Sequence, residues 1–239
     1  MRTFIFLLLV TSTNFFSQQL LTPKNVDINS KLIKDETSEA IWYTENAGSK
    51  TEIGSIITEF KKLSKTDLLI KTTVKMKQMP DASWIDSAIV KSANFQPVQH
   101  SSFNMMRNMA LIYNKDKVTG YYLDKKTQQK EDIEIPAENY FDSSSYPMLI
   151  RFFPLKENTT AELSIFDYNP RAKKGIIKAY ILEVKKTDLN GKKVWAVKTT
   201  DDISDKTTNV TYYIDPETRK IMKQDIEMNG KKMYMETIK

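Results

Sequence analysis

The side chains that commonly carry metal and nucleotide chemistry are scarce in this sequence. His100 is its only histidine and it has no cysteine, so zinc and other transition metals lack their ordinary imidazole and thiolate ligands. The six glycines lie far apart, whereas a loop that cradles phosphates needs clustered glycines. Composition therefore excludes the common metal centres and nucleotide folds, and we predict no metal site and no cofactor.

Hydrolytic chemistry would depend on His100 or on carboxylates. His100 precedes Ser101 and Ser102, but the Gly-x-Ser-x-Gly elbow of many serine hydrolases is absent. We interpret His100 as an exposed polar residue near a strand end and predict no catalytic residue. The run Asp201–Asp205 lacks the glycine and glutamate of an EF-hand calcium loop, so we interpret it as an acidic turn. The 30 acidic residues leave a carboxylate pair for polymer hydrolysis open.

One apolar segment is the candidate ligand site. Ser145 and its neighbours offer helix N-caps, Pro147 suits a first turn, and Pro154 ends the segment. The sequence predicts a short helix that is apolar almost all round and needs cover on more than one side. Arg151 is its only charge, which pairs either with an acidic ligand group or with a local acidic side chain. The predicted ligand-binding residues are Met148, Leu149, Arg151, Phe152 and Phe153.

Period-two alternation dominates the rest of the chain. In the segment 70–77, apolar residues and Thr72 occupy one face while lysines and Thr73 occupy the other, which is typical of a strand with one wet side. The segment 53–63 is interpreted as a strand that pairs with it. Asn190-Gly191 and Asn229-Gly230 predict tight hairpins. Consecutive hairpins indicate an antiparallel meander, so we expect one mainly β domain over residues 18–239.

The N-terminal residues predict export. A positive charge, a short apolar run and a small residue at Ser17 indicate a signal peptide over residues 1–17. The run is too short to span a bilayer, and without cysteine no lipid anchor follows it. We therefore expect a periplasmic or secreted protein that does not span a membrane. The net charge is +6, but only five residues are arginine and the lysines are scattered, so we predict no nucleic-acid partner.

Distinctive motifs occur along nearly the whole mature chain. They are Trp84-Ile85-Asp86-Ser87, Phe95-Gln96-Pro97, His100–Asn104, Lys117–Tyr122, Tyr140–Ser143, Tyr146–Ile150, Pro154-Leu155, Ile165–Pro170, Val194-Trp195, Tyr212–Asp215 and Gly230–Met233. With these motifs the chain resembles an uncharacterised secreted or periplasmic family, a domain of unknown function. That family is loosely similar to periplasmic lipoprotein-carrier (Lol-type) proteins. The resemblance implies a strongly bent antiparallel sheet, an open half-barrel with one or two short helices in its mouth and an acyl-binding cavity.

Three functions remain open from the sequence. The leading hypothesis is a non-catalytic binding protein that holds a lipid, an acyl chain or another hydrophobic small molecule in the cavity of a curved sheet. The second is a structural or interaction module of the cell envelope, with a protein partner and no small ligand. The third is a hydrolase of envelope polymers that uses carboxylates.

Overall fold

Alternating side chains shape most of the chain into long strands. The computed structural model describes residues 20–46 and 48–238, so the signal peptide predicted over residues 1–17 lies outside the described residues. Among the described residues, a single α-helix, α1 (Tyr146–Ile150), and a single 3-10 helix, η1 (Ser30–Leu32), accompany the strands. The strands are β1 (Leu20–Leu21), β2 (Glu36–Asn46), β3 (Ser49–Lys62), β4 (Asp67–Met76), β5 (Met79–Lys91), β6 (Pro97–Phe103), β7 (Arg107–Tyr113), β8 (Lys117–Asp124), β9 (Gln129–Pro136), β10 (Phe141–Asp142), β11 (Ala161–Tyr168), β12 (Lys174–Leu189), β13 (Lys192–Asp201), β14 (Thr208–Ile214), β15 (Ile221–Met228) and β16 (Lys231–Thr237).

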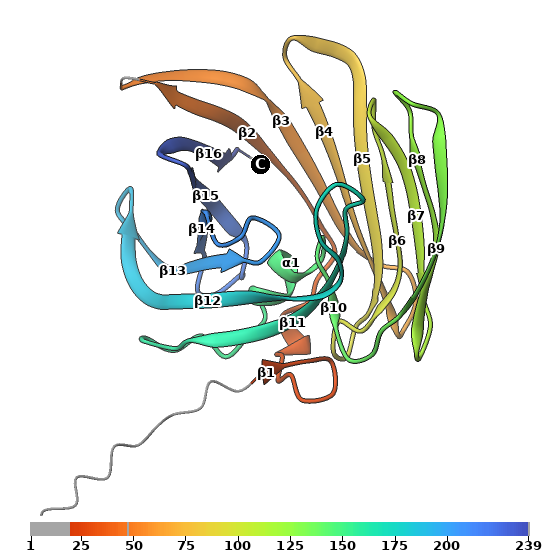
Figure 1. Cartoon of the computed structure of the whole chain (residues 1–239). Helices are drawn as coiled ribbons and strands as arrows, with labels where there is room; N and C mark the ends of the chain where they lie inside the picture. Colours follow the sequence, from red (N-terminus) through yellow and green to blue (C-terminus); the bar gives the residue numbers. More distant parts are fainter. Residues whose placement is uncertain (1–19, 47, 239) are drawn as a thin grey trace, which may run out of the picture.

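These strands form one strongly curved sheet (Figure 1). Its order is β1, then β11 through β16, then β2 through β9, and β10 also pairs with β11. All pairings are antiparallel except those of β1 and β10 with β11. The backbone ladder does not close between β9 and β11. Side chains bridge that gap instead, since the Tyr168 hydroxyl of β11 donates to Glu131 of β9 at 2.7 Å. The predicted bent antiparallel meander is confirmed.

The predicted turns and pairings hold in detail. Asn190 and Gly191 both have positive φ, as do Asn229 and Gly230, which is the backbone that a tight hairpin of this kind requires. The segment interpreted as a strand over residues 53–63 lies almost wholly within β3, and β3 pairs with β4. Local sequence signals therefore determine most of the meander.

The helix α1 lies inside the curve of the sheet (Figure 1). It is shorter than the sequence predicts: it begins at Tyr146 and ends at Ile150, and Arg151 continues into a turn. The ring of Phe152 packs against those of Phe60 and Phe95, with centroids 5.7 and 5.8 Å away, and these two rings also contact each other at 6.4 Å. The helix thus completes a hydrophobic core that fills one region of the interior.

Two glycines allow neighbouring strands to approach closely. A Cβ at Gly54 of β3 would lie 2.2 Å from the carbonyl oxygen of Lys75 in β4, and one at Gly120 of β8 would lie 2.0 Å from that of Ala110 in β7. Any larger residue must therefore push the two strands apart. Gly54 pairs with Trp42 and Met76, so it also leaves room between two large side chains on the inner face.

Candidate functional site

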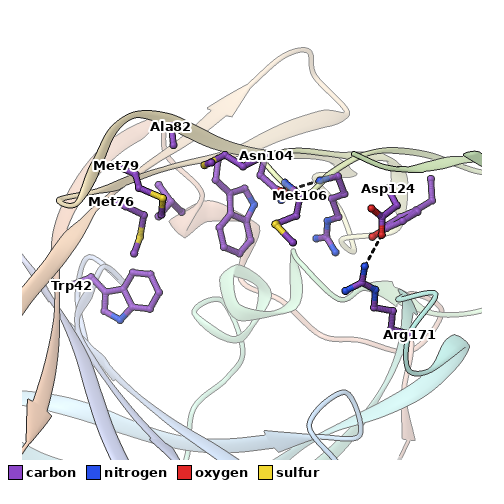
Figure 2. A pocket seen from close by; sticks show the side chains of 13 residues that line it. Trp42, Met76, Met79, Ala82, Asn104, Met106, Asp124 and Arg171 are labelled. Atoms are coloured by element: carbon purple, nitrogen blue, oxygen red, sulfur yellow. Dashed lines mark hydrogen bonds and ion pairs between the residues drawn. The ribbon is translucent and has the colours of Figure 1, made fainter. Parts of the chain in front are cut away.

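An apolar cavity of about 490 Å³ occupies one region of the inner face of the sheet. Figure 2 shows Trp42 and Met76 on one side of it and the pair of Asp124 and Arg171 on the other. Strands and turns far apart in the sequence contribute its lining: Trp42, Val74, Met76, Met79, Ala82, Trp84, Asn104, Met105, Met106, Arg107, Tyr122, Asp124 and Arg171.

Strand register explains why these side chains converge. Residues directly opposite one another in an antiparallel ladder share a face of the sheet. On β4, Ile70 faces the core, whereas Val74, further along the same face, lines the cavity. Val74 pairs with Trp84 of β5, which brings Trp84 to the same cavity. The predicted inner face of residues 70–76 is therefore confirmed. At one end of this face the side chains pack in the core, and at the other end they line the cavity.

The cavity is polar at one end. Arg171 donates from Nη2 to Asp124 Oδ2 at 2.6 Å. The guanidinium of Arg107 donates from Nε and Nη2 to the hydroxyl of Ser102 at 3.2 and 3.1 Å. Asn104 Oδ1 accepts the backbone N–H groups of Met106 and Arg107, and these bonds hold the β6–β7 turn over the cavity.

On β4 to β6 a polar layer lies between this cavity and the hydrophobic core, whereas on β8 Tyr122 belongs to a second buried hydrophobic cluster and also lines the cavity. Thr72, Asp86 and Ser102 lie opposite one another in register on β4, β5 and β6. In the next row towards the core, His100 of β6 lies between Ala88 and Leu111. The inner face therefore changes from apolar to polar and back to apolar along the strands.

His100 is buried, which corrects the prediction that it is exposed. Only 6% of the residue is accessible, and its Nδ1 lies 3.1 Å from Asp142 Oδ1. Its Nε2 faces Asp86 Oδ1 at 3.8 Å. Burial on its own lowers the pKa of His100, but the carboxylates of Asp142 and Asp86 outweigh it and raise the pKa to about 10. At neutral pH the imidazole is therefore a cation and is not available as a general base.

The partner of His100 is held by a network of hydroxyl groups. Tyr113 donates to Asp142 Oδ1 at 2.7 Å, and Ser144 donates to Asp142 Oδ2. Burial favours the neutral form of Asp142, yet His100 and these hydroxyl groups lower its pKa. Beside it, burial raises the pKa of Asp167, which accepts a hydrogen bond from Ser143. A second, smaller cavity of about 220 Å³ adjoins this network and shares Arg107 with the apolar cavity.

The five predicted ligand-binding residues lie apart from both cavities. Leu149, Phe152 and Phe153 are buried in the core, and Met148 packs against it. Arg151 is buried too, with its Nη1 at 2.5 Å from Glu36 Oε1 and its Nε donating to a backbone carbonyl. None of the five lines the 490 Å³ cavity, so the structure brings them together as core residues. Whether any of them contacts a ligand stays a prediction.

The acidic run has the turn structure that the sequence predicts. Asp201 Oδ1 accepts the backbone N–H of Ser204, and the N–H of Asp205 donates to the Asp202 carbonyl. Over residues 20–46 and 48–238, no group of three or more histidine, cysteine or acidic residues is arranged to hold a metal ion. No helix in the same stretch of the chain is both long and apolar enough to cross a membrane.

These features define a barrel-like β protein whose curved sheet is filled by a core in one region and hollow in another. The chain belongs to the family described as "Protein of unknown function (DUF3108)", whose model matches residues 37–236. The resemblance to an uncharacterised family is thereby confirmed. None of the curated proteins compared with the chain matches it.

The solved structures that match this one include the following two. A crystal structure of a "Beta-barrel-like Protein of Domain of Unknown Function DUF1849 from Brucella abortus" covers 89% of this chain and 98% of its own, with 7% identity and a TM-score of 0.56. A DUF1329 family protein from Desulfovibrio piger covers 87% of this chain and 85% of its own, with 8% identity and a TM-score of 0.24. The first likeness supports the barrel-like fold alone.

Proposed function

We propose that this protein binds a hydrophobic small molecule, a lipid or an acyl chain, in the apolar cavity of its curved sheet, without catalysing a reaction. The observation that carries the proposal is the cavity itself. Its volume of about 490 Å³ lies within the range of about 300–1,000 Å³ typical of small-molecule sites. Its lining is mostly apolar, with polar groups gathered at one end, which is the usual arrangement of such sites.

The kinds of side chain in the lining support an adaptable apolar ligand. Four methionines contribute to it, and unbranched, polarisable methionine side chains adjust to ligands of different shape. Met105 and Met106 at the rim are 58% and 55% exposed, and Trp84 is 39% exposed. Clustered apolar groups left open to water commonly mark a binding surface, and a bound chain removes them from water.

The same cavity favours a small ligand over a protein partner as the primary occupant. An interaction module of the cell envelope needs an outward patch, whereas these side chains point into a hollow of the inner face (Figure 2). The exposed rim methionines are the surface that such a partner would contact, so the interaction module is the alternative outcome of the binding test.

Tryptophan positions provide a direct test. Trp42 and Trp84 line the cavity, whereas Trp195, the third tryptophan, does not. Dibromostearate, a fatty acid whose bromine atoms quench nearby indole rings, should quench the fluorescence of the protein to a saturable limit. We expect the W42F/W84F variant to lose most of that quenching and the matched control W195F to retain it. Equal quenching in both variants, or none in the parent protein, would exclude this cavity as the site.

We also propose that the protein acts in the periplasm or outside the cell. The support is the signal-peptide pattern of residues 1–17. N-terminal sequencing of protein recovered from the envelope or the medium should find a mature start near Gln18. Retention of Met1 in that material would contradict the proposal.

A further inference from the structure

We propose that the ligand is a single-chain amphiphile with a carboxylate head group, and that Arg107 binds this carboxylate while the tail lies against Trp42 and Met76. This inference rests on the proposed function and adds the head-group chemistry. The starting observation is the charge balance of the cavity. Three charged side chains line it, namely Arg107, Arg171 and Asp124, so the cavity carries one net positive charge.

Arg107 is the source of that charge. Asp86 and Asp167 line the smaller cavity that Arg107 also lines, but they lie beyond ion-pair distance of its guanidinium. Arg171 and Asp124 form an ion pair at 2.6 Å and so balance each other. Arg107 instead uses Nε and Nη2 to contact the neutral hydroxyl of Ser102, and no carboxylate among the described residues lies within ion-pair distance of it. The residue is half-buried, so dissolved salt screens its charge less than it would screen the charge of a fully exposed side chain. A guanidinium in this position favours an anion as its partner.

Arg107 pairs in register with Asp124, and Asp124 binds Arg171, so the basic groups lie at one end of an otherwise apolar cavity. Figure 2 shows Trp42, Met76 and Met79 on one side and Arg171 with Asp124 on the other. A ligand that satisfies both regions has an apolar tail and an anionic head. One net positive charge matches a monovalent carboxylate better than a phosphate monoester, which carries about 1.5 to 2 negative charges at neutral pH.

The carboxylate of Asp124 lies near Arg107 and should repel the carboxylate head group of the ligand. Its Oδ1 accepts the backbone N–H groups of Lys126 and Thr127 at 2.9 and 3.0 Å, and its Oδ2 accepts the Arg171 guanidinium. The turn therefore fixes a negative charge beside the position we assign to the carboxylate. Asn at position 124 retains an oxygen for both backbone bonds and removes that charge, so the geometry predicts opposite effects for D124N and R107Q.

The experiment compares matched head groups on one tail. Laurate, dodecanol and dodecyltrimethylammonium would each compete with bound dibromostearate below their micellar concentrations, with recovery of tryptophan fluorescence as the readout. We expect laurate to compete at about ten-fold lower concentration than dodecanol, as one hydrogen-bonded charge contributes. The trimethylammonium compound should compete least well. Equal potency of laurate and dodecanol would overturn the inference.

The variants locate the effect. R107Q should lower the laurate-to-dodecanol preference about ten-fold, D124N should raise it, and K126Q, which removes a nearby exposed charge outside the cavity lining, should leave it unchanged. Dodecanol competition in each variant reports that the cavity is intact. An unchanged preference in R107Q would refute the role of Arg107, even if D124N raised the preference by freeing Arg171 from its ion pair.

Two further outcomes separate the inference from the proposed function. Stronger competition by dodecyl phosphate than by laurate would overturn the carboxylate assignment while leaving the apolar site in place. Failure of all the amphiphiles, dibromostearate included, to bind the parent protein would refute the proposed function itself. If R107Q fails to fold, R107M, which keeps much of the length of the side chain and removes its charge, replaces it in the same comparison.

Discussion

Because of the buried pair of His100 and Asp142, this fold should lose stability as the pH becomes alkaline. In the folded protein the imidazole has a pKa of about 10, against an ordinary value of 6.5. Because the pKa of His100 is higher in the folded protein than in the unfolded chain, the stabilisation that the charged imidazole contributes is complete below about pH 6.5. It declines as the pH rises, since the unfolded chain releases the proton first, and it is lost above about pH 10.

The size of the effect follows from the shift. One pKa unit corresponds to about 1.4 kcal/mol, so the free energy of unfolding should fall by about 1.4 kcal/mol for each pH unit within this window. The total is about 4–5 kcal/mol, which is large against the 5–15 kcal/mol typical of a whole domain. The pKa of Asp142 is lowered by the same interaction, so its shift describes the same energy and is not added.

Urea unfolding between about pH 6.5 and 9.5 measures this slope. The control is the double variant H100Q/D142N, which keeps polar side chains of similar size and removes both charges. The difference in the free energy of unfolding between the parent protein and the double variant should shrink as the pH rises. Lysines and tyrosines elsewhere titrate equally in both proteins and do not contribute to this difference. The single variant H100Q should lose about 3–5 kcal/mol, because it leaves Asp142 buried and unpaired. Parallel pH profiles of the parent and the double variant would refute the assignment of the slope to His100.

Three other perturbations test the core and one close contact between strands by urea unfolding. Phe152→Ala should cost about 3–5 kcal/mol, because it empties a packed aromatic site; a much smaller loss would mean that the ring faces unfilled space. Gly54→Ala should cost about 1–3 kcal/mol, because its Cβ meets the Lys75 carbonyl oxygen, and an unchanged midpoint would contradict that clash. Arg151→Met should cost about 3–5 kcal/mol by leaving Glu36 unpaired, and adding Glu36→Gln should recover some of the loss; no recovery would argue against the pair.

The meander could be predicted from the sequence because its signals are local. Alternation over residues 70–76 determines which side chains share a face, and dipeptides such as Asn190-Gly191 supply the positive φ that hairpins need. Each signal spans only a few residues, and consecutive strands then pair as neighbours. The close approach of Gly54 to β4 is different, because no periodicity indicates it.

The apolar cavity could not be located in the same way. Alternation indicates that Ile70 and Val74 share a face, but it does not indicate that the first packs in a core and the second lines a hollow. The sequence favours the apolar helix as a lining of the cavity, whereas in the structure this helix fills the core. The sequence did contain one signal of the cavity. The turns β4–β5 and β6–β7 lie at the same end of a meander, and methionines, including Met79 and Met106, occur at both.

The environment of His100 also depends on distant contacts. Its sequence neighbours are polar, which suggests exposure, yet the partner that keeps it charged, Asp142, comes from β10 inside the curve of the sheet. A lone histidine gives no indication of which carboxylate it will meet. Tertiary contacts therefore decide the burial of His100, while the strand pattern around it is as predicted.

The position of the polar layer gives a physical reason why one region of the interior stays hollow. Side chains such as His100 and Asp142 need fixed hydrogen-bond partners, and burying them without those partners is costly. On β4 to β6 the polar layer of Thr72, Asp86, Ser102 and His100 therefore stands between the packed core and Trp84. The apolar side chains beyond it remain partly open to water, which is unfavourable unless something covers them. An occupant that binds the folded protein alone should raise its stability with ligand concentration, so a melting temperature that rises with laurate concentration in the parent protein and less in R107Q would connect the hollow, its charge and the fold in one measurement.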